Sequence, residues 1–515
     1  MNEHQAEAVT QAQDAEGRGA PTDTWDVIVL GAGPAGENVA QYAIQGSERT
    51  AVLVEAELVG GECSYWACMP SKALLRPVEV LDAARALPGI TAEPKLDVAA
   101  VLARRDEIVS HRSDAGQVDW ARSEGIDVLR GTGRLAGDRT VDVTGPDGAV
   151  TRIHARVAVV LATGSTAVVP PVPGLAEARP WTSRDVTNMT EVPRRIAILG
   201  GGVVGCEAAT WLSAFGSEVT LIQSGPRLLP RNEPFAHDLV SKRLEEAGVK
   251  VRTGARAQRV ERSGPADNGI GRIHGGEVTL TVDGEHLVVD ELLVATGRHP
   301  ATADIGLDTI GLGELAQRRA AVPVDDQLVV RNVPGEWLFA VGDVNGLSLL
   351  THMGKYQARV CGAVIAARAE GVPLDSIRYR DVADSRAVPQ VVFTDPEVAS
   401  VGLTEQAARE AAVDVETVEH DLAALAGTYV QRPDYRGRAK LVIDRGSDLL
   451  VGATFVGPEV AELVHAATVA IIGQVPLEVL RHAVPSYPTV SEVWLRLLES
   501  REPEPPQDEE HGGEG

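Results

Sequence analysis

The sequence predicts an α/β protein with two Rossmann-like dinucleotide-binding domains and a C-terminal α+β domain. A glycine-rich turn between a strand and a helix predicts the first two domains, because it occurs at Gly31–Gly36 and again at Gly200–Gly205. A change of character at about Val388, where the chain becomes rich in strands and then helical, predicts the third. A chain of 515 residues is long enough for several domains.

The first glycine-rich turn has the full context of a nucleotide-binding unit. The apolar run Trp25–Leu30 predicts a buried parallel strand, and Thr50–Val54 predicts the next one. Glu55 follows that second strand, where an acidic side chain accepts hydrogen bonds from a ribose. The glycines that form the turn and admit a pyrophosphate are Gly31, Gly33 and Gly36.

The second glycine-rich turn repeats this arrangement, so we expect a second nucleotide with its own domain. The strands are predicted at Arg195–Leu199 and Glu218–Ile222. Gln223 follows the second of them, in the place that Glu55 has in the first unit. The glycines of this turn are Gly200, Gly202 and Gly205.

Two cysteines, Cys63 and Cys68, lie five positions apart in the segment Gly60–Lys72. On an ideal helix, five residues correspond to about 7.5 Å of rise, whereas a disulfide needs Cα atoms roughly 4.4–6.8 Å apart. A bridge between them therefore requires a distorted helical turn. A strained and accessible disulfide is easy to reduce and to form again, which is the profile of a catalytic disulfide.

Composition and charge narrow the class of protein. The formal net charge of −25 argues against nucleic acid as a partner. The longest apolar stretches, such as Val157–Ala162, are too short to span a bilayer, so we expect no membrane insertion. Four cysteines do not make a secreted disulfide framework, and we expect a cytoplasmic protein. No metal site is expected, and Cys206 and Cys361 are interpreted as buried structural residues.

Further short motifs extend the pattern along the chain, and the whole set occurs in a fixed order between about Trp25 and Ser500. The chain in this way resembles the flavoprotein disulfide reductases, which include dihydrolipoamide dehydrogenase, glutathione reductase, mercuric reductase and soluble transhydrogenase. Beside the two glycine turns and the cysteine segment, the motifs are Ala162–Ser165, Ala295–Arg298, Val341–Asp343, Phe393–Glu397 and Pro488–Glu492.

The resemblance implies that FAD binds to the first nucleotide domain and NAD(P)H to the second. Electrons would then pass through FAD to the cysteine pair and on to a small-molecule acceptor. Cys68 would be the charge-transfer thiol against the flavin, and Cys63 the interchange thiol that meets the substrate. Lys72 matches the lysine that pairs with a glutamate, here Glu207, beside the flavin. Further residues implied to line the cofactors are Thr163, Gly164 and Asp343 for FAD and Gly297 for NAD(P)H.

The composition and periodicity of the chain predict its domain limits, and the resemblance implies a homodimer. The expected divisions are a disordered tail at 1–24, the FAD-binding domain at 25–175 and 301–385, the NAD(P)-binding domain at 176–300, the dimerisation domain at 386–500 and an acidic disordered tail at 501–515. Within the dimerisation domain, the helix expected at Ala461–Gly473 is apolar around much of its circumference. It therefore predicts burial in a core or a subunit interface.

One position departs from the disulfide-reducing members of the family. They carry a histidine before Pro-Thr, oriented by a glutamate five residues later, whereas this chain has Tyr487 before Pro488 and retains Glu492. A phenol with a pKa of about 10 is a poorer base at neutral pH than an imidazole with a pKa of about 6.5. Mercuric reductases and soluble transhydrogenases resemble this chain in carrying tyrosine there, so a lipoamide or glutathione substrate is disfavoured.

Several alternatives therefore stay open. The acceptor is a disulfide, a quinone or a metal ion, although no cysteine follows Cys361 to deliver a metal as in mercuric reductases. The alternatives are a dihydrolipoamide dehydrogenase-like activity, a transhydrogenase or diaphorase that uses the cysteines little, and a non-catalytic component of a complex. The uncharged Gln223, with Arg227 nearby, favours NADPH or the use of both nucleotides.

Overall fold

The computed structural model describes residues 23–90 and 95–501, which form two compact units. The disorder expected for 1–24 and 501–515 falls almost entirely outside these residues, although Thr24 begins the first strand and Arg501 pairs with Asp448. The described residues of the first unit fall within Met1–Gly61, Asp114–Gly164 and Pro300–Arg380, and those of the second within Glu62–Ser113, Ser165–His299 and Asp381–Gly515.

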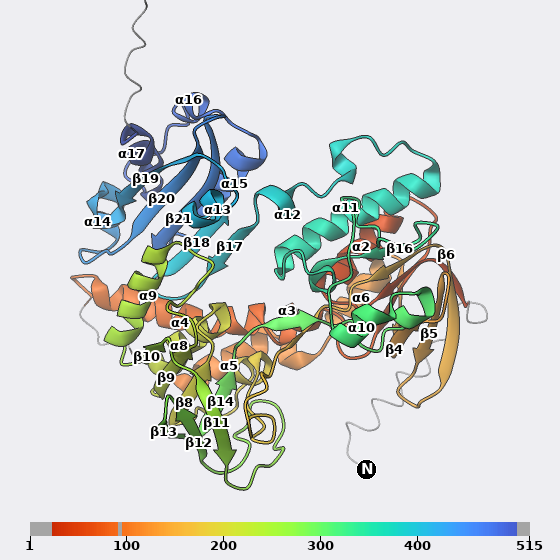
Figure 1. Ribbon diagram of the computed structural model, residues 1–515, viewed down its shortest axis with the longest axis horizontal. Coiled ribbons are helices and arrows are strands. Elements are labelled where there is room, and N and C mark those ends of the chain that lie inside the picture. Colours follow the sequence, from red (N-terminus) through yellow and green to blue (C-terminus); the bar gives the residue numbers. More distant parts are fainter. Residues whose placement is uncertain (1–22, 91–94, 502–515) are drawn as a thin grey trace, which may run out of the picture. The chain divides into compact units, whose positions relative to one another are not determined.

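The first unit is built on a seven-stranded sheet in the order β3-β2-β1-β6-β5-β4. β16 lies beside β6 (Figure 1). β1 pairs in parallel with β2 and β6, so the strands expected at 25–30 and 50–54 are neighbours. The strands are β1 (Thr24–Leu30), β2 (Ala51–Glu55), β3 (Ile126–Arg130), β4 (Thr132–Leu135), β5 (Thr140–Thr144), β6 (Val150–Leu161) and β16 (Leu338–Ala340).

Two helices of the first unit pack closely against each other, namely α2 (Pro34–Ile44) and α11 (Thr351–Glu370). Gly362 permits this approach, because a Cβ added there would lie 2.5 Å from the Cβ of Tyr42. α2 begins at Pro34, within the first glycine-rich turn, so this packing fixes the direction of its N-terminus.

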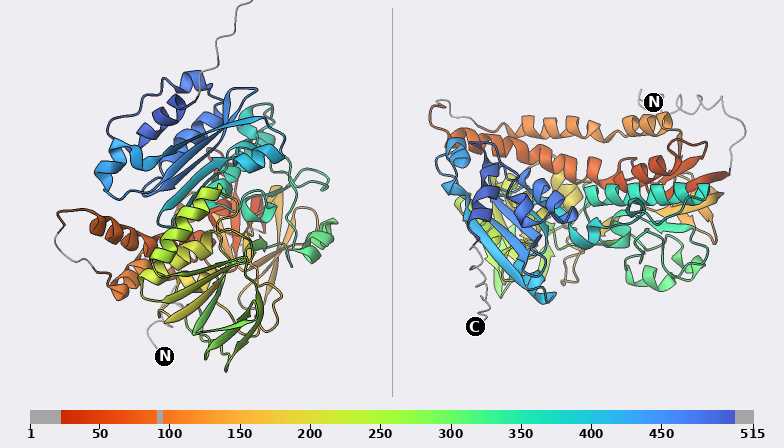
Figure 2. Two further views of the ribbon diagram at one scale, coloured as in Figure 1. Left: turned by 60° about the vertical axis from the view of Figure 1, so that its left-hand side comes forward. Right: turned by 90° about the horizontal axis from the view of Figure 1, so that it is seen from above.

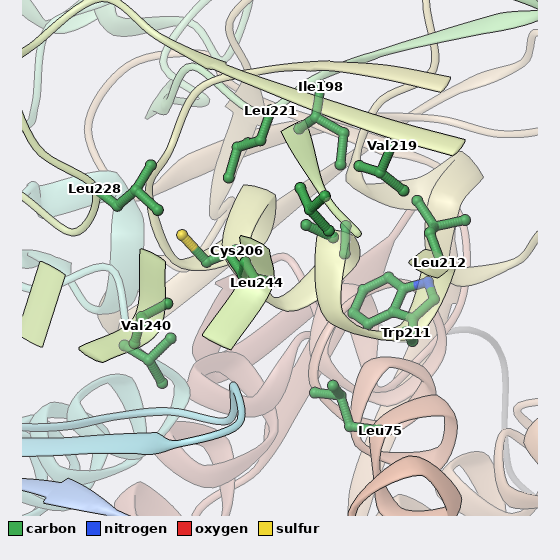
Figure 3. Close-up of a cluster of buried hydrophobic side chains, with 14 of the residues drawn as sticks. Leu75, Ile198, Cys206, Trp211, Leu212, Val219, Leu221, Leu228, Val240 and Leu244 are labelled. Atoms are coloured by element: carbon green, nitrogen blue, oxygen red, sulfur yellow. The ribbon is translucent and has the colours of Figure 1, made fainter. Parts of the chain in front are cut away.

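The second unit contains a four-stranded parallel sheet in the order β10-β9-β8-β14. Cys206, Leu221, Leu228, Val240 and Leu244 are among the apolar side chains buried at this sheet (Figure 3). The strands are β8 (Arg195–Leu199), β9 (Glu218–Gln223), β10 (Lys250–Thr253) and β14 (Glu291–Val294), the helices are α8 (Val203–Ala214) and α9 (Pro234–Glu246), and a separate antiparallel sheet contains β11 (Ala257–Arg262), β12 (Val278–Val282) and β13 (Glu285–Val289).

The cysteine segment from Glu62 onward belongs to the second unit. It forms α3 (Gly61–Tyr65) and α4 (Cys68–Ala86), and α4 lies beside α5 (Val98–Ile108) (Figure 2). The physical reason is packing, because α4 contacts α8 and its Leu74 and Leu75 share a core with Trp211.

The C-terminal part of the second unit is a five-stranded antiparallel sheet in the order β17-β18-β21-β20-β19. α15 (Leu463–Ile472) packs on β18 and β21 with one face, while Val469 and Ile472 are 55% and 39% exposed on the other. The expected α/β and α+β classes are therefore confirmed. The strands are β17 (Pro389–Val392), β18 (Glu397–Gly402), β19 (Val415–Asp421), β20 (Arg438–Asp444) and β21 (Leu449–Gly457).

Short elements complete the two units. They are α6 (Ala115–Ser123), α7 (Ser183–Thr187), α10 (Gly313–Arg318), α12 (Ala383–Arg386), α13 (Glu405–Glu410), α14 (Ala426–Gln431), α16 (Leu477–Leu480), α17 (Val493–Glu499), β7 (Ser165–Ala167), β15 (Arg298–Pro300) and the single 3₁₀ turns η1 (Ser110–Arg112), η2 (Leu307–Ile310), η3 (Gly342–Asn345), η4 (Ile377–Tyr379), η5 (Leu422–Ala424) and η6 (Val490–Glu492).

Candidate active site

The first glycine-rich turn forms a cradle that larger residues would fill. Gly31 has a φ of +96°, and a Cβ there would lie 2.4 Å from the carbonyl oxygen of Ala162. A Cβ on Gly36 would lie 2.0 Å from the oxygen of Gly31, which shows how closely α2 approaches the end of β1. At Gly33 the nearest atom would be 4.0 Å away, so this position is open for a ligand. The residues fit a bound pyrophosphate.

Two carboxylates accompany this cradle, one expected and one not. Glu55 Oε2 accepts the N–H of Ala32 at 2.7 Å, and this places the expected acid at the turn. Glu37, in the first turn of α2, is buried and its Oε1 has no hydrogen-bond partner among the described residues. Burial raises the pKa of Glu37 to about 7, with Lys355 opposing and Glu55 adding to the rise.

The remaining expected FAD residues lie in loops of the same unit. Thr163 Oγ1 donates to the oxygen of Ala301 at 2.9 Å, and the oxygen of Gly164 accepts the N–H of Ala301 at 3.0 Å. Asp343 is partly buried in the turn η3. Gln357, a fully buried residue of α11, holds this turn by accepting the N–H of Gly342 at 2.7 Å.

The second glycine-rich turn has the same construction in the second unit. Gly200 has a φ of +111°, and a Cβ on Gly205 would lie 1.9 Å from the oxygen of Gly200. Apart from its chain neighbours, no atom of the described residues lies within 4 Å of a Cβ built on Gly202. Gln223 Oε1 accepts the N–H of Gly201 at 2.9 Å, so an amide replaces the carboxylate of the first turn.

The loop at Gly297 belongs to this second unit. Gly297 has a φ of +128°, and its oxygen accepts the N–H of Val168 at 3.0 Å. The guanidinium of Arg298 holds Ser165 through its Oγ at 2.7 Å and its carbonyl oxygen at 2.6 Å. The residues of this loop and of the second turn fit a second bound nucleotide.

The two cysteines lie on either side of a break in the helical chain. Cys63 is in α3, and Cys68 opens α4. Between them Ala67 has φ −136° and ψ −89°, which interrupts the helix where the sequence predicts a distorted turn. Both cysteines are partly exposed. The N-terminus of α4 favours a thiolate at Cys68, because the helix dipole stabilises negative charge there.

Lys72 and Glu207 come together one turn further along α4. Lys72 Nζ lies 2.8 Å and 3.0 Å from the two carboxylate oxygens of Glu207. Phe393 completes the arrangement, because its N–H donates to Glu207 Oε1 at 2.9 Å and its ring lies 4.7 Å from Lys72 Nζ. The pair thus carries an ammonium group whose position is fixed from two sides.

Tyr487 and Glu492 line one cavity of about 310 Å³ in the C-terminal domain. Tyr487 is 76% exposed, while Glu492 is buried and its Oε1 accepts a hydrogen bond from Arg496 at 2.7 Å. The described residues that line this cavity include neither Cys63 nor Cys68. His482, also in this loop, is exposed.

The two remaining cysteines are buried, and the described residues offer no cluster of metal ligands. Cys206 and Cys361 are fully buried, and this burial raises the pKa of both thiols. In the part of the chain that the structure describes, no group of three or more His, Cys, Asp or Glu side chains could hold a metal ion. Within residues 23–90 and 95–501, no helix has the length and apolar character to cross a membrane.

Some residues around the site were not found from the sequence. Glu37, Gln357 and Arg184 are examples, and Arg184 contacts Glu62 beside the first cysteine. A glutamine within the apolar stretch of α11 was a readable signal for Gln357. The contact of Arg184 joins residues 122 positions apart and gave no local pattern.

The comparisons with known proteins agree with this geometry. The family model described as pyridine nucleotide-disulphide oxidoreductase matches residues 25–371, and the model of its dimerisation domain matches residues 388–497. The dihydrolipoyl dehydrogenase of Chlamydia trachomatis is 32% identical over 477 residues, which cover 92% of this chain and 96% of that protein. The mercuric reductase of Staphylococcus aureus is 30% identical over 473 residues, which cover 91% and 81%.

A solved structure is also similar. The HOCl-induced flavoprotein disulfide reductase RclA from Escherichia coli, in a complex with Cu(II), aligns with a TM-score of 0.77 and 26% identity over 92% of this chain and 99% of that one. The chain belongs to the pyridine nucleotide-disulphide oxidoreductases. It is therefore an enzyme whose cofactors are FAD and NAD(P)H, as the sequence predicts.

Proposed function

We propose that the chain passes electrons from NAD(P)H, with FAD as the intermediate carrier, through Cys63 and Cys68 to a small-molecule acceptor. The acceptor is a disulfide, a quinone or a metal ion. The observation that supports this most is the helix break at Ala67, which separates the partly exposed Cys63 of α3 from the partly exposed Cys68 at the start of α4. Lys72, which lies on α4 and pairs with Glu207 of α8, adds the cation that the resemblance implies beside the flavin.

The residues that would hold FAD are Gly31, Gly33, Gly36, Glu55, Thr163, Gly164 and Asp343, and those that would hold NAD(P)H are Gly200, Gly202, Gly205, Gln223 and Gly297. The chemistry that FAD supplies when bound is two-electron transfer between a reduced nicotinamide and a disulfide. Gln223 brings no negative charge to its turn, which supports the use of NADPH or of both nucleotides.

With a disulfide as acceptor, the thiol steps balance within the cysteine pair. The thiolate of Cys63 attacks one acceptor sulfur, the acceptor S–S bond breaks, and one acceptor thiolate leaves. The thiolate of Cys68 then attacks the sulfur of Cys63. This closes the Cys63–Cys68 disulfide and releases the second acceptor thiolate. Each released thiolate takes up one proton, and two electrons have left the enzyme.

Tyr487 is the main reason to place lipoamide below other acceptors. A phenol is a poor proton acceptor at neutral pH but can donate a hydrogen bond to a thiolate, a quinone oxygen or a metal-bound ligand. The similarity to a mercuric reductase and to RclA in its Cu(II) complex supports a metal ion. The similarity to dihydrolipoyl dehydrogenases keeps lipoamide as the second candidate.

A homodimer built on the C-terminal domain is part of the proposal. The match to the dimerisation domain supports it, and so do the exposed apolar side chains of Val469 and Val484, which are 55% and 86% exposed. A monomeric mass by light scattering at micromolar concentration would contradict it. The two buried thiols, Cys206 and Cys361, suit a reducing compartment such as the cytoplasm.

The test is anaerobic NAD(P)H oxidation with a panel of acceptors: lipoamide, low-molecular-weight disulfides, quinones, Hg(II), Cu(II) and thio-NAD. We expect one acceptor other than lipoamide to reach a kcat/KM of about 10⁴ M⁻¹s⁻¹. The Cys63→Ala variant should lose nearly all activity with this acceptor. Cys361→Ala, the same substitution at a buried thiol, serves as the control. Lipoamide as the best acceptor would favour the second candidate. Activity that survives Cys63→Ala would indicate a diaphorase.

A further inference from the structure

An ion pair lies directly beside the first cysteine, and the proposed electron transfer does not use it. Glu62 precedes Cys63 in α3. Its Oε1 accepts a hydrogen bond from Nε of Arg184 at 2.6 Å and lies 2.5 Å from Nη2 in an ion pair. Arg184 belongs to α7, 122 positions further along the chain. Both side chains are about one third exposed.

The same short helix, α7, and the residue after it also hold the loop between the cysteines. Thr187 Oγ1 donates to the oxygen of Trp66 at 2.8 Å, and Asn188 Nδ2 donates to the oxygen of Tyr65 at 3.1 Å. The guanidinium of Arg184 lies 5.2 Å from the centre of the Trp66 ring. Because Tyr65 and Trp66 directly precede the break at Ala67, these contacts fix the backbone that a disulfide has to span.

Two guanidinium groups and one carboxylate lie at this loop. Arg112 lies over the Trp66 ring at 5.8 Å, so two guanidinium groups contact this ring. Oε2 of Glu62 is buried without a hydrogen-bond partner among the described residues, so Arg184 provides the compensation for this carboxylate. Positive charge near a cysteine stabilises its thiolate, and negative charge opposes it.

We propose that the Glu62–Arg184 pair sets the reduction potential of the Cys63–Cys68 disulfide, with both residues acting as positioning residues rather than as reactants. This inference rests on the proposed function, because it requires that the two cysteines form a reversible disulfide. Loss of the Glu62 charge leaves Arg184 uncompensated, which stabilises the thiolates and makes the disulfide more oxidising. Loss of Arg184 leaves the Glu62 carboxylate uncompensated, which makes the disulfide more reducing.

The test equilibrates the holoenzyme with glutathione buffers and then labels its thiols. In this exchange the enzyme disulfide takes up two electrons and two protons, and two glutathione molecules are oxidised to one glutathione disulfide. We expect Glu62→Gln to raise the equilibrium constant for reduction about tenfold, which corresponds to about 30 mV, and Arg184→Met to lower it about tenfold. The double variant should return close to the wild-type value.

Further variants separate the charge from a structural role. Arg184→Lys keeps the charge but loses the two-pronged contact, so we expect its potential to stay near that of the wild type. Arg152→Met removes a bidentate arginine contact to Asp142 in the first unit and should not shift the potential. Shifts of the same sign in Glu62→Gln and Arg184→Met, or no shift in either, would overturn the inference. A wild type whose Cys63 and Cys68 label equally in oxidising and reducing buffers would overturn the proposed function as well.

Discussion

The two glycine-rich turns are built alike but differ in the side chains that complete them. In both, a Cβ added to the third glycine would lie about 2 Å from the carbonyl oxygen of the first. The distance is 2.0 Å for Gly36 and 1.9 Å for Gly205. In both, a side-chain oxygen accepts the N–H between the first two glycines, from Glu55 in the first turn and from Gln223 in the second. The backbone cradle is therefore shared, whereas the charge at its edge differs.

The residue after the third glycine differs as well. It is Glu37 in the first turn, a buried carboxyl whose pKa is raised to about 7, and Cys206 in the second, an apolar part of the core. From this comparison we expect the glycines to decide whether a nucleotide fits. We expect the residues after the second strand and after the third glycine to decide which charges that nucleotide meets.

The largest effect is expected from alanine at the third glycine. Gly36→Ala and Gly205→Ala place a methyl group against a backbone oxygen, and such overpacking costs about 1–3 kcal/mol or more. We expect Gly36→Ala to be purified without FAD absorbance, and Gly205→Ala to lose NAD(P)H binding by calorimetry. Both should show lower melting temperatures. Gly116→Ala in α6, where a Cβ has no neighbour within 4 Å, is the control.

Alanine at the second glycine of the motif, Gly202, distinguishes nucleotide binding from stability. In the described part of the chain, no atom other than those of its chain neighbours lies within 4 Å of a Cβ on Gly202, so Gly202→Ala should keep its melting temperature. It should still lose nucleotide affinity, because the backbone can no longer approach the phosphates. Equal losses of stability in Gly202→Ala and Gly205→Ala would contradict the separate roles given to the two glycines.

The next largest effect is a pH dependence of the free energy of unfolding that comes from Glu37 in the first turn. The Glu37 carboxyl has a pKa of about 7 in the folded chain and 4.5 as a model group, so its protonated form favours folding and this contribution is lost as the pH rises through 7. Glu37→Gln should therefore raise the free energy of unfolding at pH 8 by up to about 3 kcal/mol and leave it nearly unchanged at pH 4.

The measurement is the melting temperature of the FAD-free protein at both pH values. Glu55 at the end of β2 and Lys355 on α11 are the charged groups that act on Glu37, and neither is altered. Glu48→Gln, at an exposed carboxyl near the end of the same helix, is the control. The same pH dependence in wild type and Glu37→Gln would show that this carboxyl is not protonated in the folded chain.

The smallest effect concerns the choice between nucleotides. Gln223→Glu gives the second turn the acid of the first, and a carboxylate there should repel a 2′-phosphate. We expect the KM for NADPH to rise about tenfold, or about 1.4 kcal/mol, while that for NADH changes little. Gln258→Glu is a matched control, because Gln258 also accepts a backbone N–H, that of Gly284. An unchanged ratio of the two KM values would show that Gln223 does not determine the preference between NADPH and NADH.

How much the sequence reveals depends on how local the feature is. The glycine turns and the spacing of Cys63 and Cys68 could be predicted because each lies within a few residues of chain. The Lys72–Glu207 contact spans 135 positions and was accessible only through the family resemblance. The contacts of Arg184, and the packing of α4 on α8 that places the cysteines in the second unit, depend on tertiary structure and leave no local pattern.

The central claim is that NAD(P)H reduces a disulfide between Cys63 and Cys68, and counting thiols tests it most directly. The oxidised protein is incubated with NADPH or NADH without oxygen, then denatured, alkylated and mapped by mass spectrometry. We expect the number of alkylated residues to rise from two to all four cysteines of the chain, with the new labels on Cys63 and Cys68. Cys68→Ala should show no rise. The same number of labels before and after treatment of the wild type would contradict the account.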